Sequence, residues 1–306
     1  MSQNSLKNYT KPILTIDEQI ERYAERGLII DDKDKLIWYL KHVWYYCLGI
    51  YVKFFQNKET NMFQPWKTFS DILNLYKFDK KLRNLLFDEI QIIEESFKTA
   101  LIRELWAKLG GNTGSFWHID PGQYSCPISE FDQTVWDFFN NIISKYKNKN
   151  NDEYSNKVLN HYFSGNYNQP IPPVWMILQV MSFGQSIKLY RMLKEDNRIL
   201  VANTYNIKAK TLLWWLYNLN NLRNKCAHGE RIWNEYFVSA MQIPDRPIWE
   251  INYRDAFIWE RKMLYDYCLV IDIIMKQISN KKSILEKIWE LAQAYTIDTH
   301  LMWFPK

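Results

Sequence analysis

Residues 76–105 read YKFDKKLRNLLFDEIQIIEESFKTALIREL, and their pattern decides the fold class. Apolar residues recur along this segment at spacings of three or four, as they do on one side of a helix. These residues are Leu82, Leu86, Ile90, Ile93, Phe97, Leu101 and Leu105. Asp79 stands where a helix cap is expected, and Gly110-Gly111 ends the pattern. We therefore predict a long helix that begins at Asp79 and ends before Gly110.

Helical patterns continue on both sides of this segment. Thr15 and Glu18 form a capping box for a first helix, which Gly27 would end. A short helix is expected to begin at Thr68, and a kink is expected near Gly184. The remaining helices are predicted over 34–51, 129–142, 174–193, 208–228, 255–278 and 283–295. No stretch alternates strongly enough to predict a sheet, so the predicted fold class is all-α.

The clearest break in the helical pattern is residues 110–128, where Gly, Ser and Pro are dense. We therefore expect an N-terminal helical region over 1–109, an irregular connection over 110–128 and a C-terminal helical region over 129–306. One continuous domain is the alternative. A second break, residues 145–157, is rich in Asn and Lys and is expected to be a solvated loop.

The composition indicates a folded protein without a membrane span. Hydrophobic residues make up 47% of the 306 residues, and 39 Lys and Arg against 34 Asp and Glu give a net charge of +5. This mildly basic balance is compatible with a nucleic-acid partner but does not by itself indicate one. The apolar stretch 36–55 contains Lys41 and His42, so we interpret it as a buried aromatic helix. The N-terminus lacks the apolar core of a signal peptide, and we expect a cytoplasmic protein.

Several classes of site are excluded by the motifs that the chain lacks. Only 9 glycines occur, and neither GxGxxG nor GxxxxGK[ST] is present, so no glycine-rich phosphate loop is expected. The four cysteines are scattered without a CxxC pair, which favours free thiols in a reducing compartment. They are Cys47, Cys126, Cys226 and Cys268. No metal or cofactor is predicted.

The clearest chemical signature is in residues 221–229, which read NLRNKCAHG. Arg223 and His228 lie about 140° apart on an ideal helix, whereas Asn224 and His228 share a face. Arg223 and His228 therefore meet on one phosphate only if the helix end relaxes or a second copy completes the site. A guanidinium that neutralises phosphate and an imidazole that transfers protons suit RNA cleavage. In that reaction the 2′-OH is the nucleophile and no metal is required.

Each of these features also has a structural interpretation. Basic residues favour helix C-termini, so Arg and His at this spacing are a weak signal alone. Trp214, Trp215 and Tyr217 could stack on RNA bases, but at helical spacing such residues are more often core. The basic residues around the motif are candidate phosphate contacts or a solvated helix face. They are Lys208, Lys210, Arg223, Lys225 and Arg231.

The other histidines and acidic residues receive structural interpretations. His118 and Asp120 could indicate a metal site, but in a Gly/Pro-rich loop they are more often surface residues. His42 and His161 lie in aromatic helical stretches and are interpreted as packing residues. The pair of glutamates at 94 and 95 is expected to face solvent or form salt bridges.

Residues 222–234, LRNKCAHGERIWN, resemble the R-N-x-x-x-H region of HEPN-domain ribonucleases. More narrowly, they resemble Abi-like abortive-infection proteins of the AbiD/AbiF type. Three other blocks resemble the same family in order and content, and they are residues 25–51, 76–105 and 170–193, the last reading PIPPVWMILQVMSFGQSIKLYRML. The resemblance covers roughly residues 12 to 275. It implies a multi-helix HEPN-like bundle with additional N-terminal helices.

The resemblance also assigns roles to individual residues. It places Arg223 and His228 on the catalytic pair and Asn224 on the polar position that follows the arginine. Arg231 and Asn234 fall on downstream polar positions. The candidate RNA contacts are then Lys208, Lys210, Lys225, Arg231 and Asn234. The chain departs from the family at Gly229, where a second His is often found, at Gln179, where an acidic residue is common, and at Lys98, which replaces Arg.

The resemblance implies an endoribonuclease toxin for phage defence that cuts RNA without a metal. It further implies restraint by a small non-coding RNA antitoxin. Because HEPN ribonucleases pair two motifs across a twofold axis and this chain has one strong copy, it also implies a homodimer. A second hypothesis is a non-catalytic RNA-binding module in which Arg223 and His228 only hold phosphate. A third is a protein-only sensor of infection.

Overall fold

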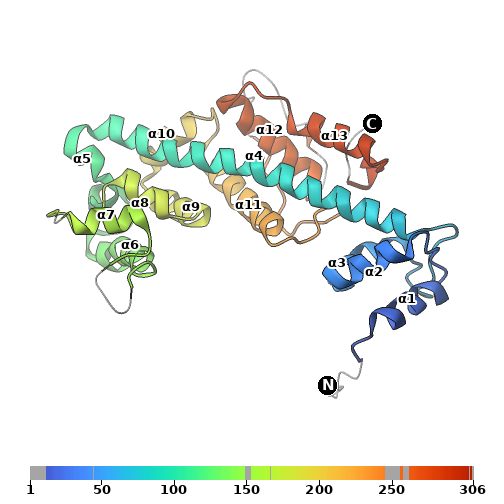
Figure 1. Ribbon diagram of the computed structural model, residues 1–306. Helices are drawn as coiled ribbons and strands as arrows, with labels where there is room; N and C mark the ends of the chain where they lie inside the picture. The colour runs from blue at the N-terminus through green and yellow to red at the C-terminus, as the bar shows by residue number, and fades with distance from the viewer. Residues whose placement is uncertain are drawn as a thin grey trace, which may run out of the picture. The chain divides into compact units, whose positions relative to one another are not determined.

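The computed structural model of the chain describes residues 12–43, 45–148, 153–165, 167–244, 256–257, 262–302 and 304. Over these residues the protein is helical, with thirteen α-helices and only isolated β-bridges between extended residues (Figure 1). The predicted all-α fold class is therefore confirmed. The chain forms two compact units. Unit 1 comprises Met1–Lys81 and Leu291–Ile297, and unit 2 comprises Leu82–Glu290 and Asp298–Lys306. The predicted division of the chain into two helical regions joined by residues 110–128 stays a prediction.

The first helix of unit 1 forms as its sequence predicts. Helix α1 (Ile16–Glu25) begins at Thr15, whose side chain and that of Glu18 each accept a hydrogen bond from the other's backbone. Gly27, with φ of +86°, ends it. The unit also contains α2 (Lys33–His42), α3 (Tyr45–Val52) and a 3₁₀ turn, Lys53–Phe55.

The helix predicted over 34–51 is broken into α2 and α3. Val43 is extended, with φ of −120° and ψ of 119°. The residues around it are β-branched or aromatic and have weak helix propensity, so the local sequence does not resist a break there. The hydrophobic pattern could not locate this break, because both halves carry apolar residues.

Helix α4 (Phe69–Leu109) is one helix of 41 residues, where two were predicted. It begins at Thr68, whose Oγ1 accepts a hydrogen bond from the Asp71 backbone at 3.1 Å. The prediction that Asp79 caps a separate helix is wrong. Asp79 lies inside α4, is fully buried, and accepts a hydrogen bond from the Tyr51 hydroxyl at 2.5 Å. A buried carboxylate needs such a partner, and this partner is distant in sequence.

The apolar stripe of α4 is the centre of the core of unit 2. All seven predicted residues, from Leu82 to Leu105, are 0% exposed. Each buried Leu, Ile or Phe side chain contributes about 1.5–3 kcal/mol relative to exposure. The ring of Phe97 contacts the rings of Phe183 and Tyr190, with centroids 6.3 and 5.5 Å apart. The stripe therefore positions the helix that begins at Phe183.

The helices that follow α4 are shorter, and they belong to unit 2 except for the end of α13 from Leu291, which belongs to unit 1. They are α5 (Gly111–Ser115), α6 (Asp137–Ser144), α7 (Lys157–Ser164), α8 (Val174–Val180), α9 (Phe183–Met192), α10 (Glu195–Asn203), α11 (Ala209–Ala227), α12 (Leu264–Ile278) and α13 (Ile284–Ala294). Short 3₁₀ turns occupy much of the segment between α5 and α6, and residues 132–136 form a π-helical turn. Helices α7 and α10 were not predicted from the sequence. Part of the helix expected over 255–278 lies outside the described residues.

The helix predicted over 174–193 breaks at Met181 and Ser182, close to Gly184. Ser182 accepts a hydrogen bond from the Gln185 backbone, and the Gln185 side chain accepts one from the Ser182 backbone at 2.8 Å. This capping box begins a new helix, so the kink expected near Gly184 is a complete break. Gly184 lies in the first turn of α9, where α9 packs against α11. A Cβ built on it would lie 3.4 Å from the Asn220 side chain, an ordinary contact distance.

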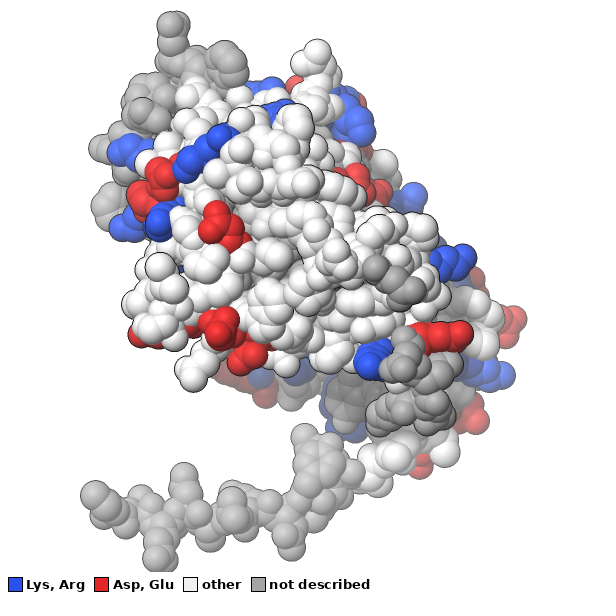
Figure 2. All heavy atoms as spheres, turned by 90° about the vertical axis from the view of Figure 1, so that its left-hand side faces the viewer, with Lys and Arg blue, Asp and Glu red and all other residues white. Residues whose placement is uncertain are grey.

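Two surface features bear on possible partners. No helix among the described residues has the length and hydropathy required to cross a bilayer. Figure 2 shows the end of unit 2 that carries α5 to α8, where a broad area is free of charged residues. Lys and Arg lie scattered toward the edges of this view and do not gather into one patch. A continuous basic surface for RNA is therefore not found on this face.

Candidate active site

The Arg–Asn–His motif lies at the C-terminal end of α11 in unit 2. The predicted helix over 208–228 is confirmed, since α11 covers Ala209–Ala227 and His228 is its C-cap residue. Leu222 and Cys226 are buried and fix the orientation of the helix end. Arg223 and Asn224 are partly exposed and His228 is exposed, so all three are accessible from solvent.

The end of α11 is a Schellman motif, a hydrogen-bonded turn closed by a residue with positive φ. Gly229 has φ of +72°, which favours glycine. Its N–H donates to the Cys226 carbonyl at 3.2 Å, and the Glu230 N–H donates to the Lys225 carbonyl at 3.0 Å. Both hydrogen bonds of the motif are present, so the position of His228 is well defined.

The helix remains regular up to His228. The His228 N–H donates to the Asn224 carbonyl at 2.9 Å, as in an undistorted turn. Arg223 and His228 therefore leave the helix in directions about 140° apart, while Asn224 shares a face with His228. The relaxed helix end that would let one copy aim both side chains at one phosphate is absent.

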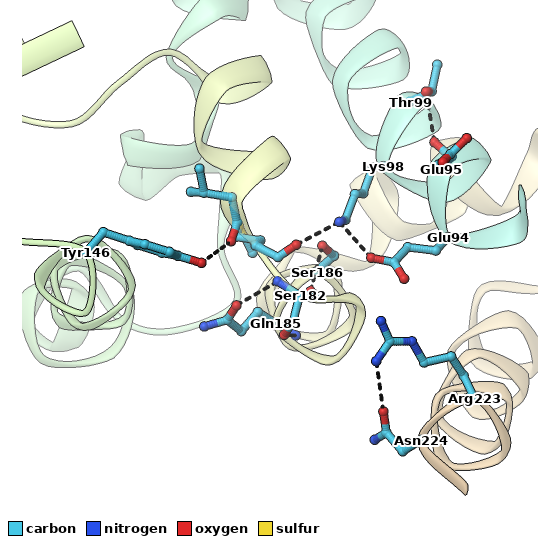
Figure 3. A network of polar contacts seen from close by, with 12 residues as sticks. Glu94, Glu95, Lys98, Thr99, Tyr146, Ser182, Gln185, Ser186, Arg223 and Asn224 are labelled. Carbon is cyan, nitrogen blue, oxygen red and sulfur yellow. Dashed lines mark hydrogen bonds and ion pairs between the residues drawn. The ribbon is translucent and has the colours of Figure 1, made fainter. Parts of the chain in front are cut away.

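The guanidinium of Arg223 has no carboxylate partner among the described residues. Its Cζ lies 5.3 Å from the ring centre of Phe87 on α4, and its Nη1 donates to Oδ1 of Asn224 at 3.3 Å. A cation over an aromatic ring is attracted by about 0.5–1 kcal/mol at exposed sites. Figure 3 shows the side chain extending from α11 toward α4 and α9. The positive charge of Arg223 is thus positioned without being neutralised.

Two neighbouring cations are neutralised by glutamates. The Lys225 ammonium lies 3.0 Å from Glu230 and 3.6 Å from Glu235, and Arg231 lies 3.0 Å from Glu235. Burial alone would lower the pKa of Lys225, but the hydrogen bond and charges of Glu230 and Glu235 raise it. The Arg83 guanidinium donates to the Glu230 carbonyl at 3.4 Å. Lys225 and Arg231 therefore hold the segment after His228 in place.

The remaining candidate RNA contacts, Lys208, Lys210 and Asn234, do not lie together. Lys208 and Lys210 are exposed at the N-terminal end of α11. Thirteen residues separate Lys210 from Arg223, which corresponds to roughly 20 Å along the helix axis. Asn234 is partly exposed and has φ of +48°, so it serves as a turn residue. Residues adjacent in sequence to the motif thus do not form one cluster around it.

The tryptophans of α11 anchor the segment that follows the motif. The Trp215 indole is 0% exposed and donates to the Gln242 carbonyl at 2.8 Å, so it is a core residue. Trp214 is 40% exposed, and its indole donates to the Ala240 carbonyl at 2.9 Å. Tyr217 is partly exposed. The core interpretation is confirmed for Trp215, which has no free face for a base.

The model of the Abi-like protein family matches residues 38–234. The matched region includes the stripe of α4, the break between α8 and α9, and the whole Arg–Asn–His motif. This chain belongs to the Abi-like protein family. The expected membership of the Abi-like family is thereby confirmed. The assignment to the AbiD/AbiF type and the HEPN motif stay predictions. The comparisons with curated proteins and with solved structures found no match.

The contacts that hold α9 of this Abi-like protein against its neighbours were not predicted from the sequence. The Lys98 ammonium on α4 donates to Glu94 and to the Met181 carbonyl, both at 2.7 Å (Figure 3). The salt-bridging role expected for Glu94 is confirmed. Because Met181 precedes the first turn of α9, Lys98 fixes where that helix begins. The only available signal was a lysine four residues after a glutamate on a predicted helix.

The prediction that His118 is a surface residue is wrong. Its imidazole is 0% exposed, and its ring centre lies 5.1 Å from that of Phe139. Neither ring nitrogen makes a hydrogen bond of standard geometry with a described residue. Burial lowers the pKa of His118 to about 3, although the Pro172 backbone acts in the opposite direction. Asp120 accepts hydrogen bonds from Gly122 and Gln123 and serves as a turn cap.

The other histidines do not form a second site. His42 and His161 were predicted to be packing residues, but both are exposed, so this prediction is wrong. The ring of His42 still lies 4.9 Å from that of Trp38. No group of three His, Cys, Asp or Glu side chains in the described part of the chain is arranged to hold a metal ion. Arg223, Asn224 and His228 at the end of α11 remain the candidate site residues of this Abi-like protein.

Proposed function

We propose that this Abi-like protein acts in abortive infection, a form of phage defence, as a metal-independent endoribonuclease. Membership of the family supports the role in defence. One observation carries the assignment of the activity. Of three cations near His228, Lys225 and Arg231 are paired with glutamates, whereas Arg223 has no carboxylate partner among the described residues. A guanidinium without a carboxylate partner, on the same helix end as an exposed imidazole, suits a phosphodiester substrate.

The proposed reaction begins with the 2′-OH of RNA, which attacks the adjacent phosphorus. A 2′,3′-cyclic phosphate forms as the bond to the 5′-oxygen breaks, and that oxygen leaves as a hydroxyl. His228 transfers the proton between the nucleophile and the leaving oxygen, and Arg223 stabilises the additional negative charge on the phosphate. Asn224, one turn before His228 on the same face, orients the imidazole or a phosphate oxygen.

We further propose that the active site is shared between two copies of the chain. In one copy, Arg223 and His228 point about 140° apart because the helix is regular up to its C-cap. A C₂ dimer would set the Arg223 of one copy beside the His228 of the other. It would also supply the second imidazole that Gly229 does not provide. Separate residues could then act as acid and base.

The activity is tested with purified protein and labelled RNA. Cleavage should persist in EDTA, and the products should end in a 2′,3′-cyclic phosphate and a 5′-hydroxyl. A substrate with 2′-deoxyribose at the cut position should be inert, because it lacks the nucleophile. A 3′-hydroxyl product, or activity lost to EDTA and restored by Mg²⁺, would contradict the mechanism. Tight RNA binding without any cleavage would instead favour the RNA-binding module.

The shared site is tested by mixing inactive variants. Arg223→Ala and His228→Ala protomers should each be inactive alone. If the site takes residues from both copies, mixed dimers should recover part of the activity, because they keep Arg223 of one copy and His228 of the other. They lack the second imidazole, so the recovery should be incomplete. A strictly monomeric active enzyme would refute the shared site.

We also propose that a small structured non-coding RNA restrains this toxin. RNA that copurifies with the protein from its native locus would raise the ratio of absorbance at 260 nm to that at 280 nm. It should appear as one discrete band on a gel. Protein that purifies free of nucleic acid, yet remains inactive until a protein partner is removed, would contradict this part of the proposal.

A further inference from the structure

A cavity of about 430 Å³ lies in unit 2 beside α12 and α13. Three aromatic side chains line it: Tyr265, Trp289 and Phe304. Tyr265 and Phe304 are 9% and 5% exposed, and their rings meet edge to face with centroids 5.5 Å apart. Trp289 is 44% exposed, so much of its indole remains accessible. The volume is within the range of small-molecule sites.

Charged side chains complete the wall of the cavity. Lys282 forms an ion pair with Glu290, so these two charges cancel. Glu286 also lines the cavity, and no described basic side chain lies within ion-pair distance of it. The described wall therefore has a net charge of −1. Glu286 and Trp289 are three residues apart on α13, so the carboxylate and the indole lie on the same face of the helix.

We propose that this cavity binds an organic cation through an alkylammonium group. The face of an aromatic ring carries negative charge and attracts a cation, and tryptophan does so most strongly. Glu286 supplies the counter-charge, while the apolar wall accommodates alkyl groups that a hydrated metal ion would not use. An anionic ligand would meet a wall of the same sign, and a neutral aromatic ligand would leave the carboxylate unused. None of the lining residues belongs to the Arg–Asn–His motif, so the inference is independent of the proposed ribonuclease.

The test uses isothermal titration calorimetry on the full chain. The probes are choline and benzyltrimethylammonium, and the matched control is 3,3-dimethylbutan-1-ol, a neutral compound of nearly the same shape as choline. At least one cation should bind saturably, and the neutral isostere should bind at least about tenfold more weakly than choline. Equal binding of the isostere would overturn the proposal. Adenosine serves as a neutral aromatic probe, and its binding in preference to both cations would overturn the proposal as well. Failure of both cations to bind would also overturn it.

Substitutions locate the binding in the cavity. Trp289→Leu and Glu286→Gln should each weaken cation binding by about fivefold or more, because each removes one favourable contact with the charge. Glu290→Gln should weaken it as well, since it leaves the Lys282 charge unpaired in the wall. Trp175→Leu is the matched control, because Trp175 is 46% exposed and lies outside the cavity. Circular dichroism melts establish that each variant folds. Unchanged affinity in both Trp289→Leu and Glu286→Gln would overturn the assignment.

Discussion

Two histidines of unit 2, His118 and His228, have opposite environments. His118 is sealed among aromatic rings without a hydrogen bond of standard geometry to a described residue, and burial keeps it neutral. His228 is exposed at the C-terminal end of α11, and Arg223 lies on the same helix. The same residue type thus serves packing in one region and is available for proton transfer in the other. The difference lies in access to solvent and substrate.

The largest expected effect is on the rate of RNA cleavage when His228 is replaced. His228→Ala should lower the rate of RNA cleavage by about 10²–10⁴-fold, because it removes a general acid–base. Its melting temperature should stay unchanged, since the side chain is exposed. His161→Ala, which removes another exposed histidine, is the matched control and should cleave like the wild type. Cleavage rates and melting curves measure both quantities. Full activity in His228→Ala would refute its catalytic role.

The second prediction concerns the dependence of stability on pH. His118 is neutral in the folded protein down to about pH 3, whereas in the unfolded chain it takes up a proton near pH 6.5. The contribution of the neutral His118 to the free energy of unfolding is therefore fully present above about pH 6.5 and is lost as the pH falls toward 3. The loss approaches tenfold in the folding equilibrium constant per pH unit.

His118→Phe keeps an aromatic ring but cannot take up a proton. The variant should lack this part of the slope, which chemical denaturation from pH 7 to pH 4 would measure against the wild type. Identical slopes would mean that His118 is not buried as a neutral imidazole.

The third prediction compares the two capping boxes. Ser182→Ala should lower the free energy of unfolding by about 1 kcal/mol, because it removes the N-cap of α9. Thr15→Ala removes the same kind of cap from α1 and should cost a similar amount. Since α9 packs on α11 through Gly184, only Ser182→Ala should also slow RNA cleavage. Urea denaturation and cleavage assays test this difference, and equal cleavage by both variants would show that α9 does not position the motif.

The smallest expected effect concerns the paired cations after the motif. Glu235→Gln removes the partner shared by Lys225 and Arg231, and partly exposed ion pairs contribute less than about 1 kcal/mol. Arg231 is released by this change, whereas Lys225 keeps Glu230 as its partner. The released Arg231 should increase RNA affinity by a few fold and steepen its dependence on salt. Glu195→Gln, which frees Arg198 instead, is the control. Binding isotherms at two salt concentrations provide the measurement. Unchanged affinity would mean that Arg231 lies away from the RNA path.

The sequence by itself determined the features that depend on residues within about four positions of one another. The stripe of α4, the cap at Thr15 and the helix end at Gly229 all formed as predicted. The spacing of Arg223 and His228 is likewise a property of the local helix. Helical hydrogen bonds and caps are short-range, so a single sequence specifies them. The roles of these residues in RNA cleavage stay a prediction.

Only the tertiary structure decided which polar residues are buried and which charges are cancelled. Asp79 resembled a cap, but it meets Tyr51, which is 28 residues away. By its sequence context His118 resembled a surface residue, but in the structure its ring packs against that of Phe139. Lys98 reaches the Met181 carbonyl, which is 83 residues away, and so fixes the start of α9. Desolvation and ion pairing depend on every neighbour in space, and sequence periodicity gives no information about neighbours that come from other helices.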